Sequence, residues 1–164
     1  MCRQALAVAV VVTCLTATPV WAADLHQLWD RQCGGCHGHA GDFARTWLHV
    51  ADGQLAGTRQ PGNIEYFLGR HNGGYPAEVI AGMTTMLRAQ AEAPDTFRQR
   101  CSSCHGTAAQ LARESLVSVD GRLTGRRSKR DVAMFLTRHG DLEDAEIPLM
   151  LDVLTRVEGE VHRQ

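Results

Sequence analysis

Cys33-Gly34-Gly35-Cys36-His37 and Cys101-Ser102-Ser103-Cys104-His105 are two copies of one pentapeptide, CxxCH, and they stand 68 positions apart. The similarity extends beyond them: residues 33–88 match residues 101–156 without a gap at 20 of 56 positions. A self-match at a fixed period indicates a duplicated structural unit. We therefore predict two tandem domains, over residues 23–91 and 92–164. Pro94 disfavours a continuous helix across the joint at residues 91–94.

Each pentapeptide also predicts a cofactor. Two cysteines three positions apart at the start of a helix can bind the two vinyl groups of one porphyrin, and the histidine that follows can bind its iron. We therefore expect two covalently attached haem c groups. The expected anchors are Cys33, Cys36, Cys101 and Cys104, and the expected proximal iron ligands are His37 and His105.

The competing interpretation of two CxxC pairs is a tetrahedral zinc site. Three features favour haem instead. A histidine directly follows both pairs, which zinc ribbons do not require. The chain has the pattern of an exported protein, and the sequence around the pairs repeats as a whole domain rather than as a short ribbon.

The N-terminus has the pattern of a secretory signal peptide over residues 1–22, with a basic start, an apolar run at Ala5–Ala17 and a small-residue cleavage site after Ala22. A retained anchor is the alternative, but the run is shorter than the ~20 residues that a membrane span needs. Cleavage removes Cys2 and Cys14 and leaves only the pentapeptide cysteines, which suits an oxidising compartment. We expect a periplasmic mature protein without stable membrane insertion.

Apolar residues within each repeat recur at helical spacing. Helices are expected over residues 25–32 and 94–100, 63–70 and 131–138, and from about Ala77 and Ala145 onward. Asn63 and Asp131 are suitable N-caps for the middle pair. Glycine-containing segments are expected at residues 52–57 and 120–125. Trp29 and Phe97, each four residues before the first cysteine, are expected to cover the turn that carries the thiols.

This order of helix, CxxCH, loop, helix, ligand loop and terminal helix resembles that of class I cytochromes c. The resemblance covers residues 23–164, twice over. It rests on the pentapeptide, the aromatic residue before it, and the glutamates Glu78 and Glu146 near the start of the terminal helices. It implies a mostly α fold with two small cytochrome c-like helical domains, each wrapped around one covalently bound haem.

The distal iron ligand departs from that family's usual pattern. Class I cytochromes c mostly place a methionine in the loop before the terminal helix, whereas this chain has His71 and His139 there, each 34 residues after its proximal histidine. Neutral imidazole ligates iron well, so both are candidate distal ligands. Alternatively, both histidines only cap a helix C-terminus, where a cation is favourable.

The other methionines and histidines are weaker ligand candidates. Four methionines lie at helical spacing and are expected to fill the core: Met83, Met86, Met134 and Met150. Four histidines have no histidine one repeat away and are expected to lie at the surface or to have a protein partner: His26, His39, His49 and His162.

Arginines recur in the repeat as the pairs Arg45/Arg113, Arg59/Arg127 and Arg70/Arg138. Each pair is expected either to bind haem propionates, for which a guanidinium provides two parallel hydrogen bonds, or to lie on a solvated helix face. The second repeat also has five cations within Arg122–Arg130. This basic segment is either a solvated face or a docking patch for an acidic redox partner.

With 17 Lys and Arg against 18 Asp and Glu, the formal net charge of −1 gives no sign of nucleic-acid binding. No acid–base constellation accompanies the pentapeptides, so an enzyme is the less favoured class. We expect a soluble periplasmic dihaem c-type cytochrome that relays single electrons between protein redox partners. The alternative is a small dihaem oxidoreductase or a gas-binding haem protein with one open iron position.

Overall fold

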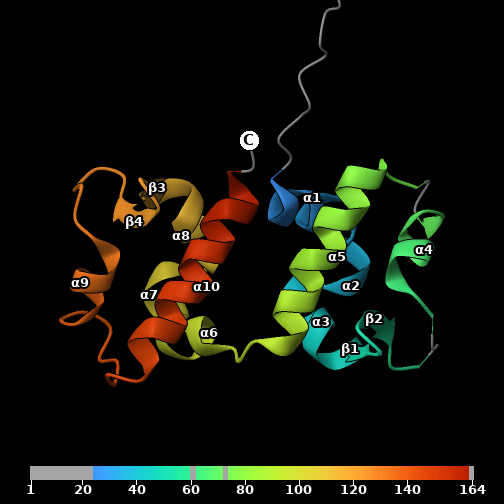
Figure 1. Ribbon diagram of the computed structural model, residues 1–164, viewed down its shortest axis with the longest axis horizontal. Helices are drawn as coiled ribbons and strands as arrows, with labels where there is room; N and C mark the ends of the chain where they lie inside the picture. The colour runs from blue at the N-terminus through green and yellow to red at the C-terminus, as the bar shows by residue number, and fades with distance from the viewer. Residues whose placement is uncertain (1–23, 60–61, 72–73, 163–164) are drawn as a thin grey trace, which may run out of the picture.

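The computed structural model describes residues 24–59, 62–71 and 74–162 (Figure 1). The expected signal peptide, residues 1–22, lies outside the described residues. Most of the described residues lie in helices, which confirms the mostly α prediction. None of the helices in this part of the chain is long and apolar enough to cross a membrane.

The same order of elements occurs twice. The first half contains α1 (Leu25–Gln32), α2 (Gly34–His37), α3 (Ala40–Trp47), β1 (Leu48–Ala51), β2 (Gln54–Gly57), α4 (Ile64–Leu68) and α5 (Ala77–Glu92). The second half contains α6 (Thr96–Arg100), α7 (Ser102–His105), α8 (Ala108–Ser115), β3 (Leu116–Val119), β4 (Arg122–Gly125), α9 (Val132–Leu136) and α10 (Glu146–Val161). From α2 to α4 every element has a counterpart 68 residues later.

The helix boundaries follow local capping. Asn63 Oδ1 accepts hydrogen bonds from the backbone N–H groups of Glu65 and Tyr66, at 2.7 and 3.3 Å, and so starts α4. Asp131 starts α9 in the same way, through the N–H of Met134 at 3.1 Å. Both helices are shorter than the expected 63–70 and 131–138, because each leaves the α-helical ladder for a turn after Leu68 or Leu136. The terminal helices begin where predicted.

The segment between α3 and α4 was expected only as a glycine-containing stretch, and it is a β-hairpin. Leu48–Ala51 pairs antiparallel with Gln54–Gly57, and Leu116–Val119 pairs with Arg122–Gly125. The two turn residues, Asp and Gly, both have positive φ: 49° and 74° in each hairpin. Such a two-residue type I′ turn matches the right-handed twist of the strands. Asp52 and Asp120 therefore adopt the left-handed conformation that this turn requires.

Substitution of the turn glycine should destabilise the protein. Gly121→Ala is expected to lower the free energy of unfolding by about 1–2 kcal/mol, because a Cβ in the left-handed region lies too close to the following carbonyl. Gly159→Ala in α10 is the control: φ is not positive there and an added Cβ meets nothing within 4 Å. Gly159→Ala should raise the free energy of unfolding by ~0.5–1 kcal/mol. Chemical denaturation measures both, and effects of the same sign would contradict the prediction.

Each half has its own buried core. The first core consists of Leu25, Trp29, Ala40, Ala44, Leu48, Leu55, Leu68, Met83, Met86 and Leu87. The second consists of Phe97, Ala109, Ala112, Leu116, Leu123, Val132, Leu136, Met150, Leu154, Val157 and Val161. Three of the four methionines are core residues, as predicted. For Met134 the prediction is wrong: its side chain is on the outer face of the short helix α9, and the residue is 71% exposed.

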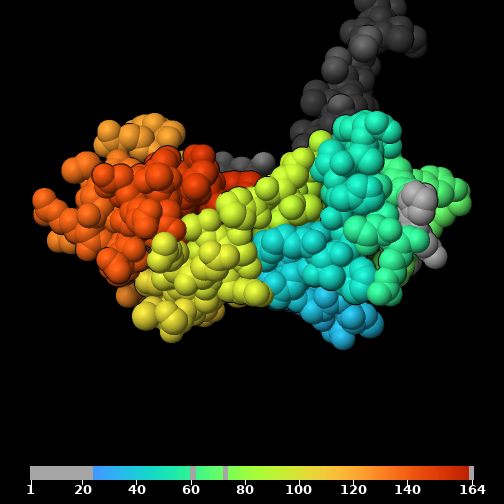
Figure 2. Space-filling view, turned by 90° about the horizontal axis from the view of Figure 1, so that it is seen from below, coloured from blue at the N-terminus to red at the C-terminus, as the bar shows by residue number. Residues whose placement is uncertain are grey.

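The two halves meet through α1 and α10 (Figure 1). His26 Nε2 of α1 lies 2.7 Å from Glu160 Oε2 of α10, and both residues are buried. Arg156 Nη1 donates to the other oxygen of Glu160, also at 2.7 Å. In the space-filling view the halves form two lobes, with the yellow-green segment that links α5 to α6 crossing between them (Figure 2). His26 thus has a partner, as predicted.

The Glu160 carboxylate should make stability depend on acid pH. Burial alone would raise the pKa of Glu160, but the hydrogen bond from His26 and the charges of Arg156 and His26 outweigh it and lower the pKa below its ordinary 4.5. The unfolded chain therefore binds the proton more readily than the folded chain. This stabilisation is complete above about pH 4.5 and is lost as the pH falls through the folded pKa.

Unfolding free energies measured against pH test this contribution. Below pH 4.5, the wild type should lose stability more steeply than Glu160→Gln, whose amide does not titrate. Glu114→Gln, at an exposed position on α8, is the control and should keep the wild-type slope. If the unfolding free energies of the wild type and Glu160→Gln fell equally steeply at acid pH, Glu160 would not be the source of this pH dependence.

Candidate functional site

The two pentapeptides have the same local geometry. Each first cysteine ends the preceding helix: the N–H of Cys33 donates to the carbonyl of Trp29 at 2.8 Å, and that of Cys101 donates to Phe97 at 2.8 Å. The following residues form the single helical turns α2 and α7. Partial burial raises the pKa of the Cys33 and Cys101 thiols. These four pentapeptide cysteines are free of disulfides.

The aromatic residues one turn before the pentapeptides are both buried, and contacts with the pentapeptide turn are seen for Trp29. Trp29 is 2% exposed and Phe97 is 6% exposed. The indole Nε1 of Trp29 donates to the carbonyl of Gly38 at 2.9 Å, which ties α1 to the end of α2. The centre of the Trp29 ring is 6.1 Å from that of His37. These contacts hold the histidine-bearing turn in the first half against the core.

The proximal and distal candidates face one another in both halves. The ring centroids of His37 and His71 are 6.0 Å apart, and those of His105 and His139 are 5.8 Å apart. An imidazole nitrogen binds a metal ion at about 2.0 Å, so two imidazoles on opposite sides of one ion have centroids roughly 6 Å apart. The structure thus brings together the histidines that the sequence paired, at the spacing of two axial ligands.

A phenylalanine four residues earlier stacks on each distal candidate. Phe67 stacks on His71 and Phe135 stacks on His139, both with centroids 4.5 Å apart and ring planes within 30° of parallel. In each half the phenylalanine lies in the short helix and the histidine lies just beyond the turn that ends it. The sequence did not single out these phenylalanines as site residues, although their identity in both repeats was a usable signal.

Each histidine pair lies at the wall of a cavity. The cavity of the second half, about 520 Å³, is lined by Cys101, Cys104, His105 and His139 together with apolar residues. That of the first half, about 700 Å³, is lined by His37 and His71 with Phe43, Trp47 and Phe67. Both have the size of cofactor sites, which are mostly apolar with a few placed polar groups.

The donor set of each cavity fits a haem. Two facing imidazoles suit an iron whose four other ligands are porphyrin nitrogens, whereas a structural zinc site needs four protein ligands together.

Comparison of the chain with protein-family models, with curated proteins and with solved structures finds no match.

The three repeat-matched arginine pairs lie in different surroundings. Arg70 lines the first cavity, with its guanidinium 4.3 Å from the centre of the Tyr66 ring, whereas Arg138 is not among the residues that line the second. Arg59 and Arg127 line the two cavities at equivalent positions, and the Arg59 guanidinium lies 4.1 Å from the centre of the Trp47 ring. They are the better-placed candidates to bind propionates.

Arg45 and Arg113 were expected either to bind propionates or to lie on a solvated helix face, and they do neither. Each forms a partly buried ion pair with an aspartate of the other half.

One residue of the basic segment does not contribute to an exposed patch. Arg126 Nη2 donates to the carbonyl of Leu116 at 2.9 Å and lies 2.9 Å from Nε2 of His162. Its side chain therefore fastens the end of the hairpin to α10. The remaining four cations of the segment are exposed: Arg122, Arg127, Lys129 and Arg130.

Proposed function

We propose that this chain is a dihaem c-type cytochrome built from two tandem class I cytochrome c-like domains, and that it relays single electrons between protein redox partners in the periplasm. The observation that carries the proposal is the facing of His37 with His71 and of His105 with His139, at nearly equal spacing, beside the cavities at the two pentapeptides. The same constellation occurring twice supports a cofactor in each half.

Each half contains residues that would hold a haem. The pentapeptide cysteines would anchor it covalently, the two histidines would bind its iron, and Arg59 or Arg127 would pair with a propionate. Cys101 and Cys104 line the second cavity, whereas the lining of the first includes His37 and His71 but neither Cys33 nor Cys36. Haem supplies one-electron redox chemistry, and the protein sets orientation, burial and axial ligands. Bis-histidine ligation lowers the potential relative to a histidine–methionine centre, because the thioether favours Fe(II).

Two histidine ligands per iron favour a carrier over a catalyst. An oxidoreductase or a gas-binding protein needs an iron position open to substrate. In this proposal His71 and His139, whose rings lie 6.0 and 5.8 Å from those of His37 and His105, would fill that position. An electron carrier needs no such vacancy. The second candidate is therefore a dihaem oxidoreductase or gas-binding protein with one open iron position. The axial ligation of each iron distinguishes it from the electron carrier.

Spectroscopy of the purified full-length protein, produced with haem c maturation, tests the proposal. We expect two covalent haems per chain, low-spin absorption and electron paramagnetic resonance (EPR) spectra, and no reaction of the reduced protein with carbon monoxide. Cys33→Ser/Cys36→Ser should retain one haem. Rapid binding of carbon monoxide at a high-spin iron would overturn the carrier in favour of the second candidate. A zinc-containing protein without haem would overturn both.

The four exposed cations of the basic segment give a proposal for partner docking. Arg127 is also a candidate to bind a propionate in the second cavity and is left unchanged in the test. Replacing Arg122, Lys129 and Arg130 with Gln should slow association with an acidic redox partner and flatten its dependence on salt, because complementary charge accelerates encounter. Arg126→Gln is the contrasting variant, since its side chain is turned inward. Stopped-flow reduction at several ionic strengths measures this, and unchanged kinetics in the triple variant would contradict it.

A further inference from the structure

We infer that reciprocal arginine–aspartate pairs brace the two halves, and that this brace holds the two CxxCH segments at one separation and orientation, so that the two haems exchange electrons as a unit. The part that concerns electron exchange rests on the proposed haem content. Arg45 and Arg113, which are identical in the repeat, form the two arms of the brace.

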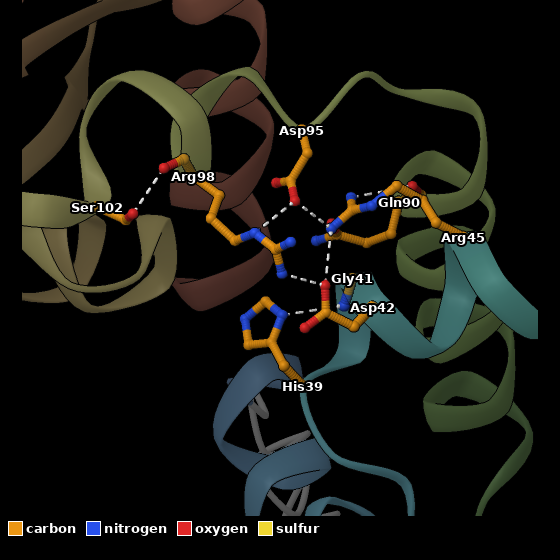
Figure 3. A network of polar contacts seen from close by, with 8 residues as sticks. All are labelled: His39, Gly41, Asp42, Arg45, Gln90, Asp95, Arg98 and Ser102. Atoms are coloured by element: carbon orange, nitrogen blue, oxygen red, sulfur yellow. Dashed lines mark hydrogen bonds and ion pairs between the residues drawn. The ribbon is translucent and has the colours of Figure 1, made fainter.

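The first arm starts in the first half and ends beside the second pentapeptide. Arg45 of α3 donates from Nη2 to Asp95 Oδ2 at 2.8 Å (Figure 3). Asp95 is the N-cap residue of α6, the helix that leads directly into Cys101. The side chains of Arg45 and Asp95 are 24% and 22% exposed, so salt screens this pair less than a surface pair.

The second arm runs in the opposite direction. Arg113 of α8 approaches Asp24 Oδ2 with Nε and Nη2, each at 2.7 Å. Asp24 is the N-cap residue of α1, whose other carboxylate oxygen accepts from the N–H of Gln27, and α1 leads directly into Cys33. Each arginine thus holds the start of the helix that carries the other half's pentapeptide. Arg113 meets one oxygen of Asp24 with two donors, whereas Arg45 meets Asp95 with one.

A polar network joins the first arm to the second pentapeptide itself (Figure 3). Arg98 of α6 bonds Asp42 of α3, and its Nε lies 3.1 Å from Asp95. Ser102, inside the second CxxCH, donates its hydroxyl to the carbonyl of Arg98 at 2.6 Å. On the first-half side, His39, two residues after His37, accepts the N–H of Gly41 at the start of α3.

Gly41 makes room for the first arm. A Cβ at this position would lie 2.7 Å from Arg45 Nη2 and 3.1 Å from the side-chain oxygen of Gln90. The equivalent residue of the second half is Ala109, which lies in the core. The presence of glycine at only one of the two equivalent positions is explained by the passage of the Arg45 guanidinium towards Asp95.

The test compares four variants of the full-length holoprotein. Arg45→Gln/Arg113→Gln removes both arms, and Arg45→Lys/Arg113→Lys keeps the charges but not the planar fork. Gly41→Ala keeps every charged group and displaces only the first arm, while alanine favours the helix. Arg31→Gln, at an exposed position on α1, is the control for loss of an arginine.

Two measurements report on the brace. Pulsed EPR between the two ferric haems gives their distance distribution, and ¹⁵N relaxation gives the tumbling of each half independently of haem chemistry. We expect one narrow distance and one tumbling time in the wild type and in Arg31→Gln. The double Gln variant should show a broad distance distribution and a separate tumbling time for each half. The double Lys variant and Gly41→Ala should give distance distributions and tumbling times between these extremes. The absorption spectrum of each haem should not change in any variant.

Failure of the brace and failure of the proposed function give different results. A single tumbling time and a narrow distance that survive in the double Gln variant would overturn the brace and leave the proposed function intact. Absence of haem from the wild type would overturn the proposed function together with the exchange of electrons. Loss of low-spin spectra in the Gln variant would show that the arginines act on the haem sites themselves, and would also overturn the brace.

Discussion

In the proposed dihaem protein, His139→Ala should leave both haems attached and open one of the two irons to carbon monoxide. The variant removes the imidazole that faces His105 at 5.8 Å, while both pairs of anchoring cysteines stay in place. The reduced protein should then show one carbon monoxide-reactive haem and one inert haem, and the oxidised protein should show a high-spin component beside the low-spin one. Absorption and EPR spectroscopy measure both changes.

The reciprocal variant and a matched control complete this experiment. His71→Ala should have the same effect on the other haem, and the double variant should make both irons reactive. His49→Ala, at an exposed position of β1 outside both cavities, should keep the wild-type spectra. If His139→Ala remains fully low-spin and inert, His139 is not the distal ligand.

The second large effect is expected in the core. Met86 is fully buried in the first half, and Met86→Ala should lower the free energy of unfolding by about 2–5 kcal/mol through lost burial and the cavity that remains. Met134→Ala is the matched control, because the same substitution at a residue that is 71% exposed should change stability by less than about 0.5 kcal/mol. Chemical denaturation of the holoproteins measures the difference.

Equal effects at the two methionines would contradict this prediction. A large loss at Met134 would mean that the outer face of α9 is covered by something other than solvent. A small loss at Met86 would mean that the first core closes around the missing atoms, since the cost of truncation depends on how far a site collapses.

Several features of the fold followed from local sequence. Asn63 and Asp131 were predicted as helix caps, because a side-chain oxygen next to free N–H groups acts within a few residues. The terminal helices followed from apolar periodicity. The hairpin did not, although Asp52-Gly53 and Asp120-Gly121 are typical type I′ turn pairs. Its strands are only four residues long, too short for alternation to stand out.

The candidate site was largely predictable because the repeat supplied a second copy for comparison. Only His71 and His139, outside the pentapeptides, recur as a histidine one repeat apart, and the structure brings each into the facing position. The roles of Phe67 and Phe135 were missed, because identity of an apolar residue in two repeats does not distinguish a core position from one that stacks on a candidate ligand.

The sequence by itself determined the features that depend on short range: the pentapeptides, the 68-residue duplication, the helix caps and the choice of distal candidates. The tertiary structure decided how the two copies meet. Arg45 and Arg113 are equivalent in sequence, yet their partners, Asp95 and Asp24, lie 50 and 89 residues away. Pairing across such separations depends on the packing of α1 against α10 and on the room at Gly41, which no local pattern encodes.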